Sequence, residues 1–449
     1  MSESRRAFSL ASLSIGGVKL TRRGWAFIVA SGVCFVAAYS GGRQELLYVA
    51  TLAAALPIVA VLIVLVKRPK LSVTRTFTPH VIQAGTTTEV ALAVRNLAPS
   101  RSMRARWQDL LPWFPHATDM RDLPALLARG PRFAGRGNST SVGYDLRPPH
   151  RGIFSVGPMH VVVEDAFGLA TSQHFVGETQ QLIVTPEVIP LAETGLSIPA
   201  GDGEARLVQR RATGDDDDAM TREYRAGDAM RRVHWRASAR HGDLMVRQEE
   251  QRSFPEARVI IDTRRAGYRD ASDDYEDEAE SAAFEWVVRM LASVAVHLRR
   301  MGFLVTVDET GTPQLDSVGR GRRRTWGDEE FLSSLAALSL VEDHDVRRTN
   351  GERASNGPTV AILGNPDVET LEWLSTQRRP GQLAVACMVQ STSSIDQINR
   401  QFGILPTASL VAELLADSGW LVVPVRADDD HAAAWEAVVV ETGRARGNG

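Results

Sequence analysis

The strongest constraint on the fold of this chain is an uncharged and mostly apolar run of 21 residues, 46–66. As a helix that rises about 1.5 Å per residue, this run spans a bilayer core of roughly 30 Å. A shorter uncharged run, 24–39, precedes it after a brief polar connection. A cleaved signal peptide is the alternative for the first run, but a second apolar run so close behind favours a two-helix transmembrane hairpin over residues 24–66.

Basic residues flank both outer sides of the predicted hairpin. Five Lys or Arg residues precede the first run and four lie within residues 67–75, whereas the connection holds only Arg43. Cytoplasmic flanks of membrane helices carry the excess of positive charge. We therefore expect a multi-pass protein of the plasma membrane, with both termini and the soluble domains in the cytosol. Residues 1–23 are expected to form a basic cytosolic tail.

Two soluble domains are predicted after the hairpin. Residues 70–190 contain short alternating segments punctuated by Gly, Pro and Asn, which is typical of an antiparallel β-sandwich; the clearest segments are 71–77, 88–95, 141–146 and 159–163. Over residues 255–445 buried-strand patterns alternate with helical ones, which favours a doubly wound α/β domain with a mostly parallel sheet. The predicted strands there are 257–262, 303–307, 359–363, 382–389 and 420–425, and the predicted helices are 284–298, 331–340, 368–377, 408–416 and 431–441. The fold class is therefore a membrane helical hairpin plus a multidomain α and β protein.

The densest charge pattern is the segment 221–247, which lies in a linker region over residues 191–254. Seven arginines stand against three carboxylates between residues 222 and 247, a net charge of +4. Turn signals at Gly227-Asp228 and Gly242-Asp243 predict that the segment folds back on itself as a rigid basic module. We expect its apolar residues to pack the module onto the α/β domain; these are Tyr224, Trp235 and Leu244.

The arginines of this module have two interpretations. In the first, Arg222 or Arg231 pairs inward with Glu223 or Asp228. The remaining guanidinium groups, including those of Arg236 and Arg240, then stay available for carboxylates of a protein partner. In the second, every arginine is used internally to join the β-sandwich to the α/β domain, and the module is a joint rather than a docking surface.

The module closely resembles the signature of the bacterial domain-of-unknown-function 58 family. The matching positions are Arg222, Glu223, Tyr224, Gly227, Asp228, Arg231, Trp235, Ala237, Arg240, Gly242, Leu244 and Val246. The segments 151–158 and 165–169 resemble the same family, although strand-end turns and core aromatics would also account for them. The resemblance implies a membrane-anchored protein with a von Willebrand A-like domain, often encoded beside a MoxR-type AAA+ ATPase.

A von Willebrand A-type metal site requires Asp-x-Ser-x-Ser after the first strand of the α/β domain, where oxygen ligands hold Mg²⁺. In this sequence Arg264 and Ala266 replace both serines that would follow Asp262, and Arg264 places positive charge where a dication would sit. We therefore expect a degenerate site without metal. Nucleophile-elbow, phosphate-loop and dinucleotide motifs are absent from the sequence, so we expect neither catalytic residues nor a cofactor.

Two functions from different classes follow. The first is a non-catalytic docking or scaffold protein in the lipid bilayer, which works with a cytosolic partner such as a MoxR-type AAA+ ATPase in envelope or complex-assembly processes. The second is a ligand- or metal-binding receptor or enzyme, with a site at the carboxyl edge of the α/β sheet near Asp262. The incomplete metal motif favours the first. A net charge of −3 argues against a nucleic-acid partner, and the sequence leaves the oligomeric state open.

Overall fold

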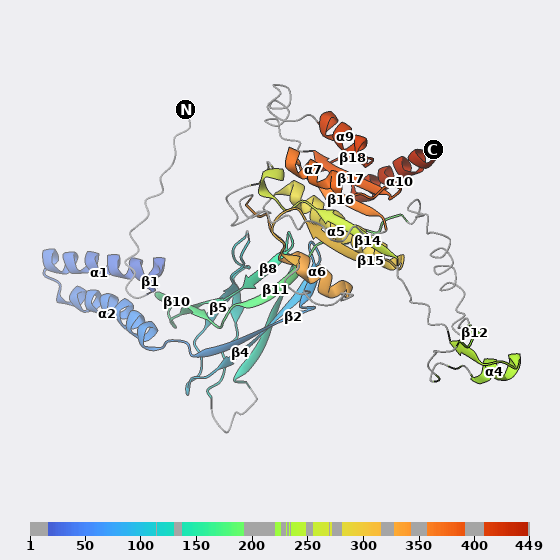
Figure 1. Cartoon of the computed structure of the whole chain (residues 1–449). Coiled ribbons are helices and arrows are strands. Elements are labelled where there is room, and N and C mark those ends of the chain that lie inside the picture. Colours follow the sequence, from blue (N-terminus) through green and yellow to red (C-terminus); the bar gives the residue numbers. More distant parts are fainter. Residues whose placement is uncertain are drawn as a thin grey trace. The chain divides into compact units, whose positions relative to one another are not determined.

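The structure is a computed structural model of the 449-residue chain (Figure 1). It describes residues 17–113, 115–129, 137–192, 221–225, 230, 233, 235–247, 255–268, 270–271, 281–315, 327–342, 357–390 and 408–447. The chain divides into two compact units. The first comprises residues 1–185 and 274–278, and the second comprises residues 186–273 and 279–449.

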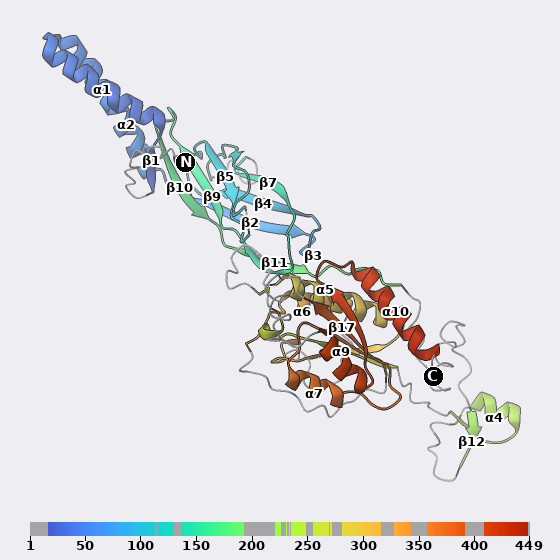
Figure 2. The ribbon, with the colours of Figure 1, turned by 90° about the horizontal axis from the view of Figure 1, so that it is seen from above.

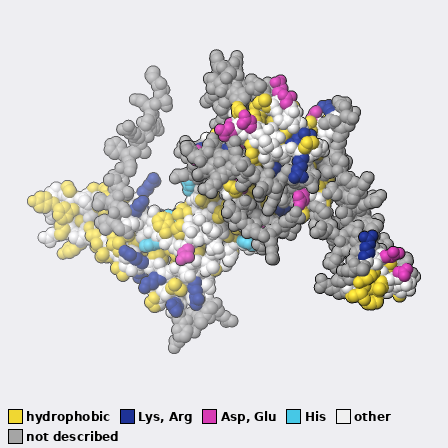
Figure 3. Space-filling view, viewed as in Figure 1, with side chains coloured by type: hydrophobic (Ala, Val, Ile, Leu, Met, Phe, Trp, Pro, Cys, Tyr) yellow, Lys and Arg dark blue, Asp and Glu magenta, His cyan; other side chains and the backbone are white. Residues whose placement is uncertain are grey.

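The first unit contains two apolar helices packed side by side, α1 (Arg22–Gly41) and α2 (Gln44–Val66) (Figures 1 and 2). By length and composition alone, both helices could cross a membrane. Thr21 caps α1, because its hydroxyl accepts a hydrogen bond from the Gly24 amide at 3.2 Å. The surface of the pair is mostly hydrophobic (Figure 3). For example, Val36 is 67% exposed and Leu52 is 63% exposed, which is costly in water and typical of helices that face lipid.

Three small sheets in the first unit surround one hydrophobic core. Their strand orders are β1-β10-β9-β5-β6, β2-β4-β7 and β3-β11-β8. Strand β4 shows why they pack, since its residues alternate between buried and exposed along most of its length; inner-face residues such as Leu92, Trp107 and Leu182 fill the core. The bounds are β1 Val18–Leu20, β2 Leu71–Thr78, β3 Val81–Gln83, β4 Thr88–Asn96, β5 Ala105–Asp109, β6 Arg121–Leu123, β7 Ser139–Leu146, β8 Gly152–Val156, β9 Met159–Glu164, β10 Ala170–Val176 and β11 Gln180–Thr185.

Two details of this β-domain differ from the sequence prediction. The sheets are not wholly antiparallel, because β3 pairs with β11 in parallel. The basic tail predicted over residues 1–23 is also too long, because β1 adds to the edge of β10 as an antiparallel strand and α1 begins at Arg22. Val18 is buried against Leu169 and Ala170, and this apolar contact is what orders the segment. The helical hairpin therefore lies between β1 and β2, two strands of one domain.

A buried ionic network links strands from two sheets of the β-domain. The Arg75 guanidinium donates through Nε to Asp109 Oδ2 at 2.8 Å, and the Tyr144 hydroxyl donates to the same oxygen at 2.7 Å. Arg75 also donates to the Glu178 carbonyl oxygen at 3.0 Å. These bonds leave the buried carboxylate well satisfied. Burial, together with the Asp109 charge, raises the pKa of Tyr144, so that it remains a neutral donor.

The second unit contains a five-stranded, all-parallel sheet of order β15-β14-β16-β17-β18. One face of the sheet is covered by α5, α6 and α10 and the other by α7 and α9 (Figure 2), so the parallel α/β architecture agrees with the sequence prediction. The strand bounds are β14 Glu256–Ile261, β15 Leu304–Glu309, β16 Thr359–Leu363, β17 Ala384–Gln390 and β18 Leu421–Arg426; the helix bounds are α5 Ala282–Arg300, α6 Asp328–Ala336, α7 Val368–Thr376, α9 Ala408–Asp417 and α10 His431–Gly447.

Candidate functional site

The candidate site lies at the carboxyl end of β14, where the strand order of the parallel sheet reverses. The chain leaves β14 to form β15 on one side and later returns to form β16 on the other. Crevices at such reversal points are where open α/β sheets usually bind ligands. Asp262 follows β14 directly, Thr310 follows β15, and Asp367 stands a few residues after β16. The topology therefore brings these three polar side chains to one edge of the sheet.

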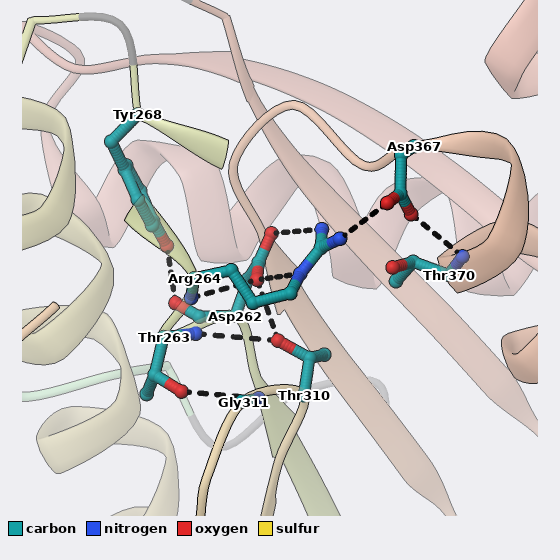
Figure 4. Close-up of polar contacts among 8 residues, drawn as sticks. All are labelled: Asp262, Thr263, Arg264, Tyr268, Thr310, Gly311, Asp367 and Thr370. Atoms are coloured by element: carbon teal, nitrogen blue, oxygen red, sulfur yellow. Dashed lines mark hydrogen bonds and ion pairs between the residues drawn. The ribbon is translucent and has the colours of Figure 1, made fainter. Parts of the chain in front are cut away.

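The guanidinium group of Arg264 occupies the space between the two carboxylates (Figure 4). Its Nε and Nη2 atoms donate to the two oxygens of Asp262 at 3.0 and 3.1 Å, and Nη1 lies 2.9 Å from Asp367 Oδ2. The Asp262 side chain is fully buried and that of Arg264 is 2% exposed, whereas that of Asp367 is 53% exposed. The protein's own cation thus neutralises a buried carboxylate and reaches a second one at the surface.

Neighbouring groups hold this arrangement in place. The Thr310 hydroxyl donates to Asp262 Oδ1 at 2.6 Å, and the Tyr268 hydroxyl donates to the Asp262 carbonyl oxygen at 2.7 Å. A Cβ atom on Gly267 would lie 2.7 Å from Asp262 Oδ2. Only glycine therefore lets the short 3-10 helix η3 (Arg265–Gly267) pass so close to the carboxylate.

The pKa shifts around the site agree with this distribution of charge. Burial on its own would raise the pKa of Asp367, but hydrogen bonds with Thr370 and the nearby Arg264 guanidinium outweigh burial and lower it. Burial, assisted by the Asp262 charge, raises the pKa of Tyr268 well above its usual value. At neutral pH Asp367 is therefore ionised and faces the Arg264 guanidinium. Tyr268 is a neutral phenol that donates to the Asp262 carbonyl oxygen.

The charged groups at this edge are paired with one another. Within the described ranges, no three His, Cys, Asp or Glu side chains are grouped so that they could hold a metal ion. Cys387 lies on β17 away from solvent, and burial raises the pKa of its thiol to about 12, which suppresses the thiolate. The Asp262 carboxylate already accepts hydrogen bonds from the Arg264 guanidinium and the Thr310 hydroxyl.

The basic module of the second unit folds back on itself, as its turn signals predict. Strand β12 (Thr221–Glu223) pairs antiparallel with β13 (Met245–Arg247), and α4 (Trp235–His241) lies between them in the chain. Ser238 joins α4 to β13, because its hydroxyl accepts from the Met245 amide at 2.8 Å. Val233 and Val246 are buried inside the module, and Gly242 ends α4 with a φ of 83°.

The apolar contacts expected for the module need correction. Trp235 was expected to be buried against the α/β domain but is 65% exposed, and Leu244 is 40% exposed; only Tyr224 is half-buried. The small core of the module is formed by Val233, Met245 and Val246, and the larger apolar side chains lie outside it. Met230 is also exposed, at 55%, and Figure 3 shows hydrophobic atoms gathered on one side of this module.

The charged and turn residues of the signature are described only in part. Glu223 and Arg240 are exposed, and Glu223 has an interaction partner in the structure. The side chains of Arg222 and Arg236, and all of Gly227, Asp228 and Arg231, lie outside the described residues. The proposed inward pairing of Arg222 or Arg231 therefore stays a prediction.

The fold and the site together define a chain with two parts: an apolar hairpin joined to a β-domain, and a basic module followed by a parallel α/β domain whose edge carries an internal ion pair. The family resemblance of the signature is confirmed over residues 220–312, which match the model of the family described as "Protein of unknown function DUF58". The matched region includes the module, Asp262, Arg264 and Thr310, whereas Asp367 lies beyond it.

Several solved structures are similar to parts of the chain. No curated protein matches the chain. A solved structure that is similar in part is the CARDB domain of the PF1109 protein of Pyrococcus furiosus, described in complex with di-metal ions (13% identity, 24% of this chain and 94% of that chain, TM-score 0.16). Another is the alkylpurine DNA glycosylase AlkC of Pseudomonas fluorescens, bound to DNA containing an abasic site analog (11% identity, 31% and 38%, TM-score 0.17). A third is the sporulation control protein Spo0M of Bacillus subtilis (8% identity, 25% and 49%, TM-score 0.13). At such TM-scores these similarities carry no functional information.

Sequence reasoning found Asp262 and Arg264 but missed Thr310 and Asp367. Both missed residues stand just after predicted strands of a parallel sheet, and the carboxyl ends of parallel strands share one edge. That position was a usable signal. The order of the strands, which decides which of several strand ends are neighbours, was not available from the sequence.

Proposed function

We propose that this chain is a non-catalytic docking protein of the plasma membrane, with its soluble parts in the cytosol. One observation carries the proposal: the Arg264 guanidinium fills the space between Asp262 and Asp367, at the edge of the sheet where a ligand would bind. In the von Willebrand A-like domain that the family resemblance implies, a dication would occupy this region. In this chain Arg264 supplies the positive charge instead. We therefore propose that this edge of the sheet has a structural role and does not bind a cation.

The hairpin and its connections support the membrane part of the proposal. Strands β1 and β2 belong to one β-domain and flank the hairpin in sequence, so both ends of the hairpin must lie on the side of the membrane where that domain lies. Lys and Arg residues concentrate at these two ends, and such residues favour the cytosolic side. The soluble parts of the chain are accordingly cytosolic in the proposed topology.

The exposed side of the basic module supports the docking part. Met230, Trp235 and Leu244 are 55%, 65% and 40% exposed, and Arg240 on α4 is exposed as well. Tryptophan and arginine are the residues most enriched where protein interfaces gain their binding energy. We propose a MoxR-type AAA+ ATPase as the partner, on the basis of the family resemblance, with roles in envelope or complex assembly.

The proposal is tested by measuring binding between the detergent-purified full chain and a purified MoxR-type ATPase of the same organism. Trp235→Ala should weaken binding by about thirtyfold or more, as expected for a central interface tryptophan that contributes roughly 2 kcal/mol or more. The matched control is Phe175→Ala, because Phe175 on β10 is 66% exposed and Trp235 is 65% exposed. Equal binding by the Trp235→Ala variant and the wild-type chain would remove the module from the interface, and no binding by the wild-type chain would reject this partner.

A further inference from the structure

A second candidate site lies in the first unit, where the two apolar helices meet the β-domain. A cleft of about 350 Å³ opens there between α1, α2 and the loop that joins β9 to β10. Volumes of this size are typical of sites for small molecules. Every side chain in the lining is apolar except one arginine; the lining consists of Arg23, Ala26, Phe27, Leu56, Phe167 and Leu169.

The β9–β10 loop is held rigidly by a single buried carboxylate. Asp165 is 5% exposed and accepts hydrogen bonds from the amides of Phe167, Leu169 and Ala170 at 2.8, 2.6 and 2.7 Å. The loop nevertheless presents the Phe167 ring outward, 63% exposed. A phenyl ring that a well-ordered loop keeps in water is costly. The ring is therefore open to contact with an apolar phase or ligand beside the cleft.

The start of α1 is fixed against the same loop. The Thr21 amide donates to the Leu169 carbonyl oxygen at 2.9 Å, and the Thr21 hydroxyl donates to the Gly168 carbonyl oxygen at 2.6 Å. A Cβ atom on Gly24 would lie 2.3 Å from the Leu169 carbonyl oxygen, so only glycine permits this approach. The loop and the first turn of α1 therefore form one preformed wall of the cleft.

Positive charge lies at one edge of this cleft. Arg23 is exposed and stands four residues before Phe27 on α1, on the same side of the helix. Its guanidinium and the Glu164 carboxylate both lie near Gly168, since a Cβ atom built on that glycine would be 3.7 Å from Arg23 Nη1 and 2.9 Å from Glu164 Oε1. Lys19 and Arg22 are exposed nearby in the chain and leave the local balance positive.

We infer that this cleft binds an anionic phospholipid. The lipid phosphate meets the Arg23 guanidinium, which is suited to two parallel hydrogen bonds with phosphate oxygens. An acyl chain lies along Phe27 and Leu56, and the Phe167 ring enters the bilayer beside it. The inference rests on the membrane part of the proposed function, since the cleft opens beside helices that would face lipid. Beyond that proposal, the inference states that the chain prefers anionic lipid headgroups and that the β9–β10 loop contacts the bilayer.

The experiment uses the full chain, purified in a mild detergent and titrated with phosphatidylglycerol, with phosphatidylcholine as the neutral comparison. Native mass spectrometry counts the lipids retained on each protein molecule. Arg23→Gln should weaken phosphatidylglycerol binding by about tenfold or more, because a hydrogen bond to a charged group is lost. Phe167→Ser should weaken the binding of both lipids. The matched controls are Arg95→Gln, an exposed arginine on β4, and Phe175→Ser, whose ring is as exposed as that of Phe167.

The outcomes separate this inference from the membrane proposal. If the wild-type chain is extracted from cell membranes by alkaline carbonate, the hairpin does not span the bilayer and the membrane proposal fails. If the chain resists extraction but Arg23→Gln retains phosphatidylglycerol as the wild type does, the lipid site alone is refuted. Equal retention of phosphatidylglycerol and phosphatidylcholine by the wild type would also refute it. Selective retention that is lost in both cleft variants and kept in both controls supports it.

Discussion

Replacing Arg264 by methionine should destabilise the α/β domain strongly, because it removes the cation but leaves the buried Asp262 carboxylate. The guanidinium makes two hydrogen bonds to Asp262 and one contact with Asp367, at 3.0, 3.1 and 2.9 Å. Breaking a buried pair from one side costs about 3–5 kcal/mol. Most of this cost comes from Asp262, since the Asp367 side chain is 53% exposed and water can solvate it.

The measurement should report on this domain alone, because a chain with two compact units need not unfold in one transition. Amide hydrogen exchange of β14 and β16, followed by mass spectrometry on the full chain, has this property. A loss of about 3–5 kcal/mol corresponds to exchange that is roughly 10²- to 10³-fold faster or more. The control is Arg265→Met. Arg265 pairs at 3.6 Å with Glu342, whose side chain is 70% exposed, so its loss should cost about 1 kcal/mol or less.

Two further variants would show whether the unpaired Asp262 charge causes the loss of stability in Arg264→Met. Adding Asp262→Asn to Arg264→Met should restore most of the lost protection, because the amide oxygen still accepts from Thr310 while the buried charge is gone. Mg²⁺ should leave the wild-type chain unchanged but stabilise Arg264→Ser, which exposes two carboxylates and adds a hydroxyl. If Arg264→Met exchanges at the wild-type rate, the guanidinium does not neutralise Asp262 and the reasoning is wrong.

Two other predictions concern acid stability and topology. Burial lowers the pKa of His431 to about 4, where its ring stacks on Trp286 at 4.6 Å. The unfolded chain therefore binds the proton more tightly, and the domain should lose about 2 kcal/mol of stability between pH 7 and pH 5. Exchange measured at both pH values should show this loss, and a His431→Phe variant that keeps the full loss would exclude His431 as its source. In intact cells, cysteines introduced at Glu3 and Gly449 should both be shielded from an impermeant thiol reagent; labelling of either would overturn the cytosolic topology.

The regular elements could be predicted wherever one physical pattern dominated. Strand β4 was visible because its buried residues alternate with exposed ones, and α5 was visible because apolar residues recur at helical spacing along its buried face. Strand β1 was missed because it has three residues in a basic segment and gains its order from Leu169 and Ala170, far along the chain. Non-local packing of this kind leaves no periodic signal in a short strand.

The sequence predicted a positive charge beside Asp262 at the candidate site, but it did not predict every residue that lies there. The sequence placed Arg264 beside Asp262, and these two residues form the buried pair. Asp367 joins them only because β16 lies next to β14, which is a fact of topology. The exposure of Trp235 was also unpredictable, because tryptophan is usually well buried and the module fills its small core with Val233 and Val246 instead.

The connection between the hairpin and the β-domain limits how the two can be separated. Strand β1 precedes α1, and it hydrogen bonds to β10 at an edge that would otherwise be open. A fragment that begins after the hairpin, at residue 70, would lack β1 and expose that edge, which is a known route to aggregation. It would also uncover Leu169 and Ala170, which are 3% and 0% exposed in the whole chain because β1 and α2 cover them. Aggregation of such a fragment would therefore follow from the loss of β1 and α2, and it would not show that the fragment lacks a partner.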